Sequence, residues 1–300
     1  MNRTIASVMI RRTISLKNDY YESRLESLYK DRLESLYKEY YGNGGCPFFD
    51  ECEKGISKSC TFRFDKAKVG EKYGENSEIP KIVFVGLEGL NEHQGIEKPE
   101  TDKCYNPHYK GVRYVLAYLL SSYFSKERPD SVLKECLKDY VETMEYFALL
   151  NCYKCAFGDK PKGRPHSEAM RVNCQEILFR EIEALEPDIV VFQVKDESKR
   201  PNDFVKNLEK NFGEKNPIYG NTESENTDTG AYWYTLPSGK RFIWIWTYHG
   251  AGRTHSQKQG WASNDISGKD YREKDLDPVL NAVLDAMRQL NLSENSAGNE

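Results

Sequence analysis

The sequence predicts an α/β fold: a three-layer α/β/α sandwich with a mostly parallel, four-stranded central sheet and an additional N-terminal helix. Three short apolar runs support this prediction, namely KIVFVG at 81–86, YFALLN at 146–151 and DIVVF at 188–192. Runs of this kind are typical of strands that are buried on both faces of a parallel sheet. Segments with helical spacing lie between them, which favours parallel strands joined by helices.

The segments around these runs predict the remaining elements. Helical spacing is found at 111–124, at 131–143 and at 278–290. Residues 231–249 predict a hairpin followed by the last core strand, because a Pro-Ser-Gly turn separates two apolar runs. A longer helix is expected at 167–185. Its buried stripe would consist of Met170, Cys174, Ile177, Leu178, Ile182 and Leu185.

An amphipathic helix is predicted near the N-terminus, at residues 20–41, where RLESLYK occurs twice. We expect it to dock on the core, and binding of a partner is the alternative. The chain then divides into a helical extension over 1–45, one domain over 46–292 and a tail over 293–300 that is expected to be disordered. The apolar positions of the helix are Tyr21, Leu25, Leu28, Leu33, Leu36 and Tyr40.

Composition and charge limit the classes of function. Lys and Arg total 43 against 47 Asp and Glu, a net charge of −4, so contact with DNA would require a local basic or backbone-rich surface. The sequence contains neither an apolar run of membrane-spanning length nor a clear secretory signal, so we expect a cytoplasmic protein. In such a chain, eight cysteines favour metal ligands or buried thiols over disulfides. No obligate protein partner is evident.

Polar residues follow the predicted strands, where ligands bind in α/β sheets. Glu88 could activate water or stabilise a developing cation, and the carboxamide of Asn151 could read one edge of a base. As a neutral imidazole, His249 could stabilise negative charge on a departing ring. Gln193 and Thr247 also occupy strand ends. Each residue type is common in turns, so it is their coincidence at one edge that indicates a site. The loop after His249 is suited to phosphate and contains Gly250, Ala251, Gly252 and Arg253.

With these motifs, the chain from Lys81 to about His255 resembles the uracil-DNA glycosylase superfamily, especially its iron–sulfur members. Gly86-Leu87-Glu88 matches the first motif, with Glu88 in the catalytic position. FALLNCYKC matches the second motif through Asn151, and TYHGAGR matches the last one. Tyr109 matches an aromatic residue that stacks on the extruded base. Glutamate in the catalytic position, with no proline after it, departs from the pattern of the cluster-bearing members and leaves the substrate base open.

The resemblance implies a DNA glycosylase that flips uracil or a modified pyrimidine out of DNA and hydrolyses its N-glycosidic bond, in DNA repair or anti-phage defence. Glu88 and His249 would be catalytic, and the loop 250–253 would contact DNA. Gly86, Leu87, Tyr109 and Asn151 would bind the base. The alternative is a binding module on the same fold that recognises nucleic acid or a nucleotide without cutting it.

The resemblance also implies a [4Fe–4S] cluster that is bound by four thiolates. Cys155 and Cys174 match the later pair of ligands. For the earlier pair we favour Cys52 and Cys60, with Cys46 in reserve, because the spacing of these three cysteines departs from the family pattern. Zinc is the alternative metal, since four thiolates also suit zinc. The cysteines expected to be ordinary thiols are Cys104, Cys136 and Cys152.

Overall fold

The computed structural model covers the sheet and most of the helices around it. It describes residues 29–40, 46, 48–52, 62–64, 66–77, 79–88, 107–124, 145–157, 168–193, 203–219, 229–248 and 266–297. The expected helix at 131–143 lies outside this part of the chain. So do the expected site residues Cys60, His249, Gly250, Ala251, Gly252 and Arg253. The backbone is described but the side chain is not for Leu87, Glu88, Tyr109 and Cys155.

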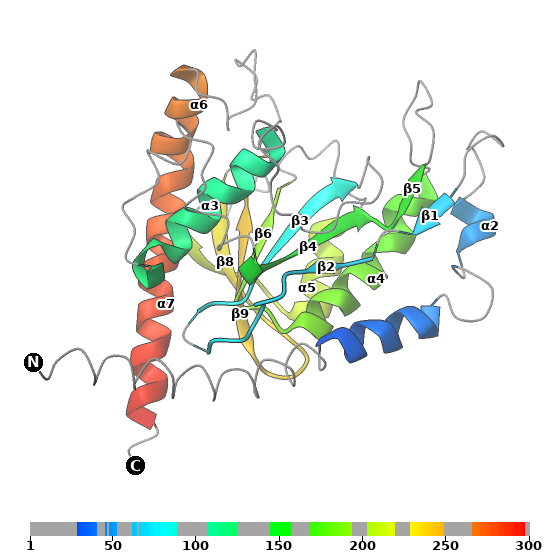
Figure 1. Cartoon of the computed structure of the whole chain (residues 1–300), viewed down its shortest axis with the longest axis horizontal. Helices are drawn as coiled ribbons and strands as arrows, with labels where there is room; N and C mark the ends of the chain where they lie inside the picture. Colours follow the sequence, from blue (N-terminus) through cyan, green and yellow to red (C-terminus); the bar gives the residue numbers. More distant parts are fainter. Residues whose placement is uncertain are drawn as a thin grey trace, which may run out of the picture.

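A mixed sheet of seven strands forms the centre of the molecule, in the order β2-β4-β3-β6-β9-β8-β7 (Figure 1). The four central strands β4, β3, β6 and β9 are parallel neighbours, whereas β2, β8 and β7 are antiparallel additions at the two edges. In the order of the sheet, the strands are Lys68–Val69, Phe147–Tyr153, Ile82–Glu88, Ile189–Phe192, Arg241–Trp246, Gly230–Thr235 and Asn216–Tyr219.

The α/β class is confirmed, but the sheet is wider than the four strands that we expected. The hairpin expected at 231–249 is present, because β8 and β9 pair in antiparallel fashion from Thr235 and Arg241 onwards. The unexpected edge strands have weak sequence signals. β2 contains two residues, and β7 reads Asn-Pro-Ile-Tyr with three exposed side chains, so neither shows the alternation of a half-buried strand.

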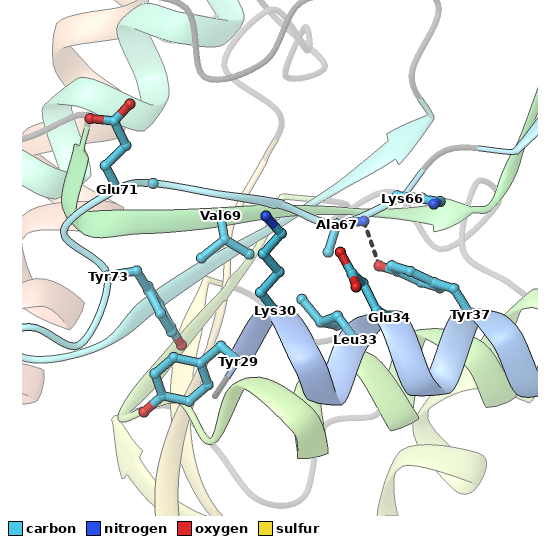
Figure 2. A pocket seen from close by; sticks show the side chains of 11 residues that line it. Tyr29, Lys30, Leu33, Glu34, Tyr37, Lys66, Ala67, Val69, Glu71 and Tyr73 are labelled. Carbon is cyan, nitrogen blue, oxygen red and sulfur yellow. Dashed lines mark hydrogen bonds between the residues drawn. The ribbon is translucent and has the colours of Figure 1, made fainter. Parts of the chain in front are cut away.

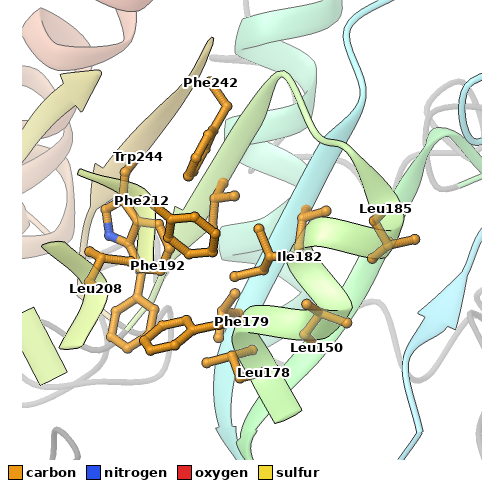
Figure 3. Close-up of a cluster of buried hydrophobic side chains, with 14 of the residues drawn as sticks. Leu150, Leu178, Phe179, Ile182, Leu185, Phe192, Leu208, Phe212, Phe242 and Trp244 are labelled. Atoms are coloured by element: carbon orange, nitrogen blue, oxygen red, sulfur yellow. The ribbon is translucent and has the colours of Figure 1, made fainter. Parts of the chain in front are cut away.

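One face of the sheet is covered by α4 (Glu168–Leu185), α5 (Phe204–Phe212) and the N-terminal helix, which is described over residues 29–40 (Figure 1). A cluster rich in aromatic rings fills this interface, with Phe192 and Trp244 of the sheet against Phe204 and Phe212 of α5 (Figure 3). The stripe expected along α4 is confirmed, since all six of its residues are buried.

The N-terminal helix docks on this same face, as expected for residues 29–40. Leu33 and Leu36 are buried as predicted, while Tyr29 and Tyr37 add two buried rings that the repeated motif did not single out. The hydroxyl of Tyr37 donates a hydrogen bond of 2.7 Å to Glu181 of α4. The helix is therefore fixed to the core by both apolar and polar contacts.

The opposite face is covered by α3 (Pro107–Phe124) and α7 (Asp277–Ala297), which follows α6 (Ile266–Tyr271) and a π-helical turn at Arg272–Leu276. Tyr114 of α3 donates to Asp277 at 2.6 Å, and Tyr118 donates to Asn281 at 2.9 Å, so the two helices run in the same direction. α7 extends to Ala297, beyond the end expected near residue 290. Helical backbone thus covers the start of the segment 293–300 that we expected to be disordered.

A small second unit lies beyond the sheet. α2 (Phe49–Cys52) contacts α4, and β1 (Phe62–Phe64) pairs in antiparallel fashion with β5 (Cys155–Phe157). No helix in the described part of the chain is both long and apolar enough to cross a membrane.

Candidate active site

Four residues form a row across the carboxyl ends of the parallel strands: Asn151 on β4, Gly86 on β3, Gln193 after β6 and Thr247 after β9. Gly86 and Asn151 are partners in the strand register, and the other two directly follow their strands. Side chains alternate between the faces of a strand, so this row continues the apolar face that packs against α3 and α7. The expected convergence of strand ends is therefore confirmed for the described part of this edge.

Gly86 makes room for the carboxamide of Asn151. A Cβ atom at Gly86 would lie 3.2 Å from Asn151 Oδ1, closer than nearly all such contacts in proteins. The Asn151 side chain is 9 % exposed, so it is largely withdrawn from water while its oxygen lies over the glycine. A glycine at this position lets a polar group and a flat ligand approach the strand closely.

Gln193 is the other carboxamide in the row. Its backbone N–H donates to Val85 O at 2.9 Å, which continues the β3–β6 ladder past the last strand residue. The side chain is fully buried, and neither its nitrogen nor its oxygen has a hydrogen-bond partner in the part of the chain that the structure describes. The sequence indicated its place at a strand end without giving it a role.

Thr247 is held by Tyr271 at the end of α6. The Tyr271 hydroxyl lies 3.1 Å from Thr247 Oγ1 and 2.8 Å from Thr229 Oγ1, and it accepts a bond of 3.4 Å from the backbone N–H of Tyr248. Burial raises the pKa of Tyr271 to about 12, although these hydrogen bonds act in the opposite direction. This network anchors the start of the segment that leads to His249.

The helices on this face begin near the same edge. Tyr271 joins the end of α6 to the end of β9, and α3 runs parallel to α7, so the first turn of α3 lies towards the carboxyl ends of the strands. Tyr109 belongs to that first turn. Glu88 pairs in register with Tyr153, two residues beyond Gly86. The backbone of both residues is thus consistent with the expected site.

No protein-family model matches the chain, and no curated protein matches it significantly. The functional assignment therefore depends on the strand-end geometry and on the motifs.

The cysteines of the expected cluster are partly brought together. Cys52 of α2 and Cys174 of α4 belong to one small buried cluster with Tyr153 and Met170. Asn173 Nδ2 lies 3.7 Å from Cys52 Sγ. Burial raises the pKa of the Cys174 thiol to about 11, and Cys46 interacts electrostatically with both Cys174 and Cys52.

The position of Cys155 also fits this small buried cluster, which we call the cysteine corner and which contains Cys52, Tyr153, Met170 and Cys174. It directly follows Lys154, whose backbone N–H donates to Cys174 Sγ at 3.4 Å. Among the described side chains, however, no three His, Cys, Asp or Glu residues lie close enough to hold a metal ion. Cys152 is fully buried in the core, as expected for an ordinary thiol.

Lys154 and Glu181 form a buried ion pair beside the cysteines. Both side chains are almost completely buried, and the Glu181 carboxylate binds the Lys154 ammonium group with one oxygen and the Tyr37 hydroxyl with the other. Glu181 was not singled out from the sequence. It follows Cys174 by seven residues, about two helical turns, and this spacing places it on the buried side of α4. This ion pair connects α4, the end of β4 and the N-terminal helix.

A pocket of about 310 Å³ lies away from this edge, between the N-terminal helix and residues 66–73 (Figure 2). Tyr29, Leu33 and Tyr37 line it on one side, and Val69 and Tyr73 on the other. It belongs to the face that carries α4 and α5, opposite the row with Asn151. Its mixture of lysine and glutamate side chains suggests no particular chemistry, and the sequence did not indicate it.

Proposed function

We propose that the protein is a DNA glycosylase that binds an extruded base at the carboxyl ends of β3, β4, β6 and β9 and hydrolyses its N-glycosidic bond. The observation that carries the proposal is the buried Asn151 carboxamide over Gly86, at the ligand-binding edge of a parallel sheet. A carboxamide in such a place offers one donor and one acceptor to a base edge. The motifs that resemble uracil-DNA glycosylases supply the rest of the proposal.

The other residues take their roles from the motifs. Tyr109 stacks on the flipped base, and Asn151 reads its edge. Glu88 orients water or stabilises the sugar cation, and His249 supports the departing base. The loop 250–253 holds the DNA. Extrusion costs a few kcal/mol, least for damaged or mispaired bases, so it contributes to selectivity.

We also propose a [4Fe–4S] cluster that acts as a scaffold beside α4. The proposal is supported by the motifs and by the burial of Cys52 and Cys174 in one small cluster. The ligands of the iron–sulfur cluster would be Cys52, Cys155 and Cys174, with Cys46 or Cys60 as the fourth. Cys60 remains the choice that the spacing suggests, and Cys46, which interacts electrostatically with Cys52 and Cys174, is the alternative. Thiolates must replace thiols on binding, so loading would release protons.

The decisive test is excision by the purified protein on single- and double-stranded oligonucleotides that carry a panel of bases, followed by alkaline cleavage. We expect alkali-labile sites with at least one base. Glu88→Gln and Asn151→Ala should each lower the rate about 100-fold or more without loss of the fold, since positioned acid–base groups and positioned hydrogen-bond donors each contribute on this scale. Circular dichroism and the melting temperature check the fold.

Matched controls are Glu214→Gln and Asn216→Ala, which change the same residue types at exposed positions near the far edge of the sheet. Both should cleave like the wild type. Full activity in Glu88→Gln and Asn151→Ala would show that the site is wrongly assigned. Salt-dependent binding without any alkali-labile product would instead support the binding module.

The cluster is tested by metal and sulfide analysis of the purified protein. We expect a brown protein whose iron is lost in Cys174→Ala and in one of Cys46→Ala and Cys60→Ala, and retained in the control Cys152→Ala. Iron that is retained in Cys46→Ala but lost in Cys60→Ala would support the choice from the spacing. Zinc in place of iron would show that the metal is wrong.

A further inference from the structure

Gln193 is a buried polar residue at the carboxyl end of β6. It is fully buried, and within the described part of the chain both polar atoms of its carboxamide lack hydrogen-bond partners. Leaving such a group unpaired in the folded state is costly, so most buried carboxamides in proteins are paired. A buried carboxamide with a free donor and a free acceptor at a ligand-binding edge therefore points to a ligand.

Two other buried residues with an unpaired polar atom differ in their surroundings. The Tyr234 hydroxyl and the Trp244 indole nitrogen belong to residues of the aromatic cluster under α5. In this cluster Trp244 packs against Phe192 at a centroid distance of 5.3 Å (Figure 3). Tyr234 and Trp244 each have a large ring whose burial compensates for one lost hydrogen bond. Gln193 has no ring, and two of its atoms lack a partner among the described residues. It lies on the opposite face, in the row with Asn151.

The row brings the two carboxamides to either side of Gly86. Neighbouring strands are about 4.8 Å apart, so Asn151 and Gln193, two strands apart, have Cα atoms about 10 Å from each other. The residue between them has no side chain, and Asn151 Oδ1 lies above it. Thr247, next along the row, is bonded to Tyr271 and does not compete for Gln193 in the described contacts. A flat ring that lies beyond Gly86, past the end of β3, would have one carboxamide on each flank.

We propose that Gln193 is a second base-reading residue of this site, and that the preferred base carries hydrogen-bonding groups on two opposite edges. This inference rests on the proposed glycosylase function and narrows its substrate. Uracil has its carbonyl and N–H groups on one edge, and only C–H groups at C5 and C6 on the opposite one. Uracil bound to Asn151 would leave Gln193 unpaired, whereas a pyrimidine with a polar group at C5 would satisfy it.

The first experiment asks whether Gln193 has a structural partner, and it does not depend on catalysis. In the full-length protein, Gln193→Leu should leave the melting temperature unchanged or raise it by about 2 °C, because an apolar residue of similar size removes an unpaired amide. The matched control is Gln175→Leu. Gln175 is also buried, but it accepts a 3.0 Å hydrogen bond from Asn207, so its replacement should lower the melting temperature.

The second experiment measures selectivity as the ratio of kcat/KM for 5-hydroxymethyluracil to that for uracil in the same duplex. We expect the wild type to favour the hydroxymethylated base roughly tenfold or more, the scale of one buried hydrogen bond. Gln193→Leu should reduce this ratio towards one, whereas Gln175→Leu should leave it unchanged. A change in the ratio distinguishes reading of the base from a general loss of activity.

The outcomes separate this inference from the proposed function. A fall in melting temperature like that of Gln175→Leu, or an unchanged ratio, would overturn the role of Gln193 while the glycosylase assignment stands. If the wild type excises no base, the proposed function fails and the same ratio is taken from binding affinities for the two duplexes. Discrimination that disappears in Gln193→Leu would then still support a base-reading role, and equal affinities would refute it.

Discussion

Tyr271 couples the stability of the site to alkaline pH. Burial raises its pKa to about 12 from an ordinary value of 10.0. The protonated form is therefore favoured more strongly in the folded protein, and the stabilisation is fully present below pH 10 and lost as the pH rises towards 12. A pKa difference of about two units between the folded and unfolded states corresponds to about 2–3 kcal/mol of unfolding free energy.

We expect Tyr271→Phe to be less stable than the wild type at pH 7 by about 1 kcal/mol, because the hydroxyl network with Thr229 and Thr247 is lost. Above pH 10 the difference in unfolding free energy between the two proteins should narrow, since phenylalanine has no proton to lose. Urea unfolding of both proteins from pH 7 to 12 measures this. A gap that stays constant with pH would show that Tyr271 does not titrate in this range.

At the residue scale, the sequence predicted positions better than roles. Glycine and asparagine at strand ends indicated Gly86 and Asn151, because strand ends can be located from apolar runs. That Gln193 lacks a hydrogen-bond partner among the described residues depends on the folded arrangement of the sheet and could not be read from its own neighbourhood in the sequence. Glu181 was missed for a similar reason, since its partners Lys154 and Tyr37 lie 27 and 144 positions away.

At the scale of elements, α4 connects two regions of the protein. One stripe of this helix carries Cys174 towards the cysteine corner and Glu181 towards Lys154. The ion pair is buried, so loss of one partner leaves a charge without compensation, whereas loss of both leaves only a packing defect.

Glu181→Gln should therefore lower the free energy of unfolding by about 3 kcal/mol, as measured by urea denaturation. The double variant Lys154→Met/Glu181→Met, which removes both charges, should be clearly more stable than this single variant. Equal losses in the two proteins would mean that packing around α4, and not the unpaired ammonium group, sets the cost.

Long elements were predictable because their patterns repeat. α4 has six buried apolar positions at helical spacing, and the hairpin of β8 and β9 has a clear turn. β1, β2 and β7 have two to four residues each, too few for a period to be recognised. Pairing across the chain creates these short strands, so they become visible only in the folded structure.

At the scale of the whole molecule, the sheet separates two packed regions. The face with α4, α5 and the N-terminal helix holds a large aromatic core and the cysteine corner. The face with α3 and α7 ends in the row with Asn151 and Gln193. The α/β class and the parallel core follow from the alternation of strands and helices. The width of the sheet does not follow from this alternation, because it depends on edge strands with weak sequence signals.

We expect those edge strands to limit association between copies of the protein in concentrated solution. An exposed, regular strand recruits neighbouring copies into continuous sheets, and natural proteins avoid this with short or interrupted edges. β2 offers only two residues at one end. β7 has Pro217, which lacks an N–H donor, and a register irregularity between Pro217 and Tyr219 at the other end.

Pro217→Val should restore a regular edge and promote self-association during storage, seen as growing light scattering at high concentration, with little change in the melting temperature. The control Thr235→Val introduces the same residue at an exposed position of β8, which is already paired on both sides. If both variants remain monodisperse, the proline is not what keeps the molecules apart. In this view, the least regular strand of the sheet is a safeguard against aggregation.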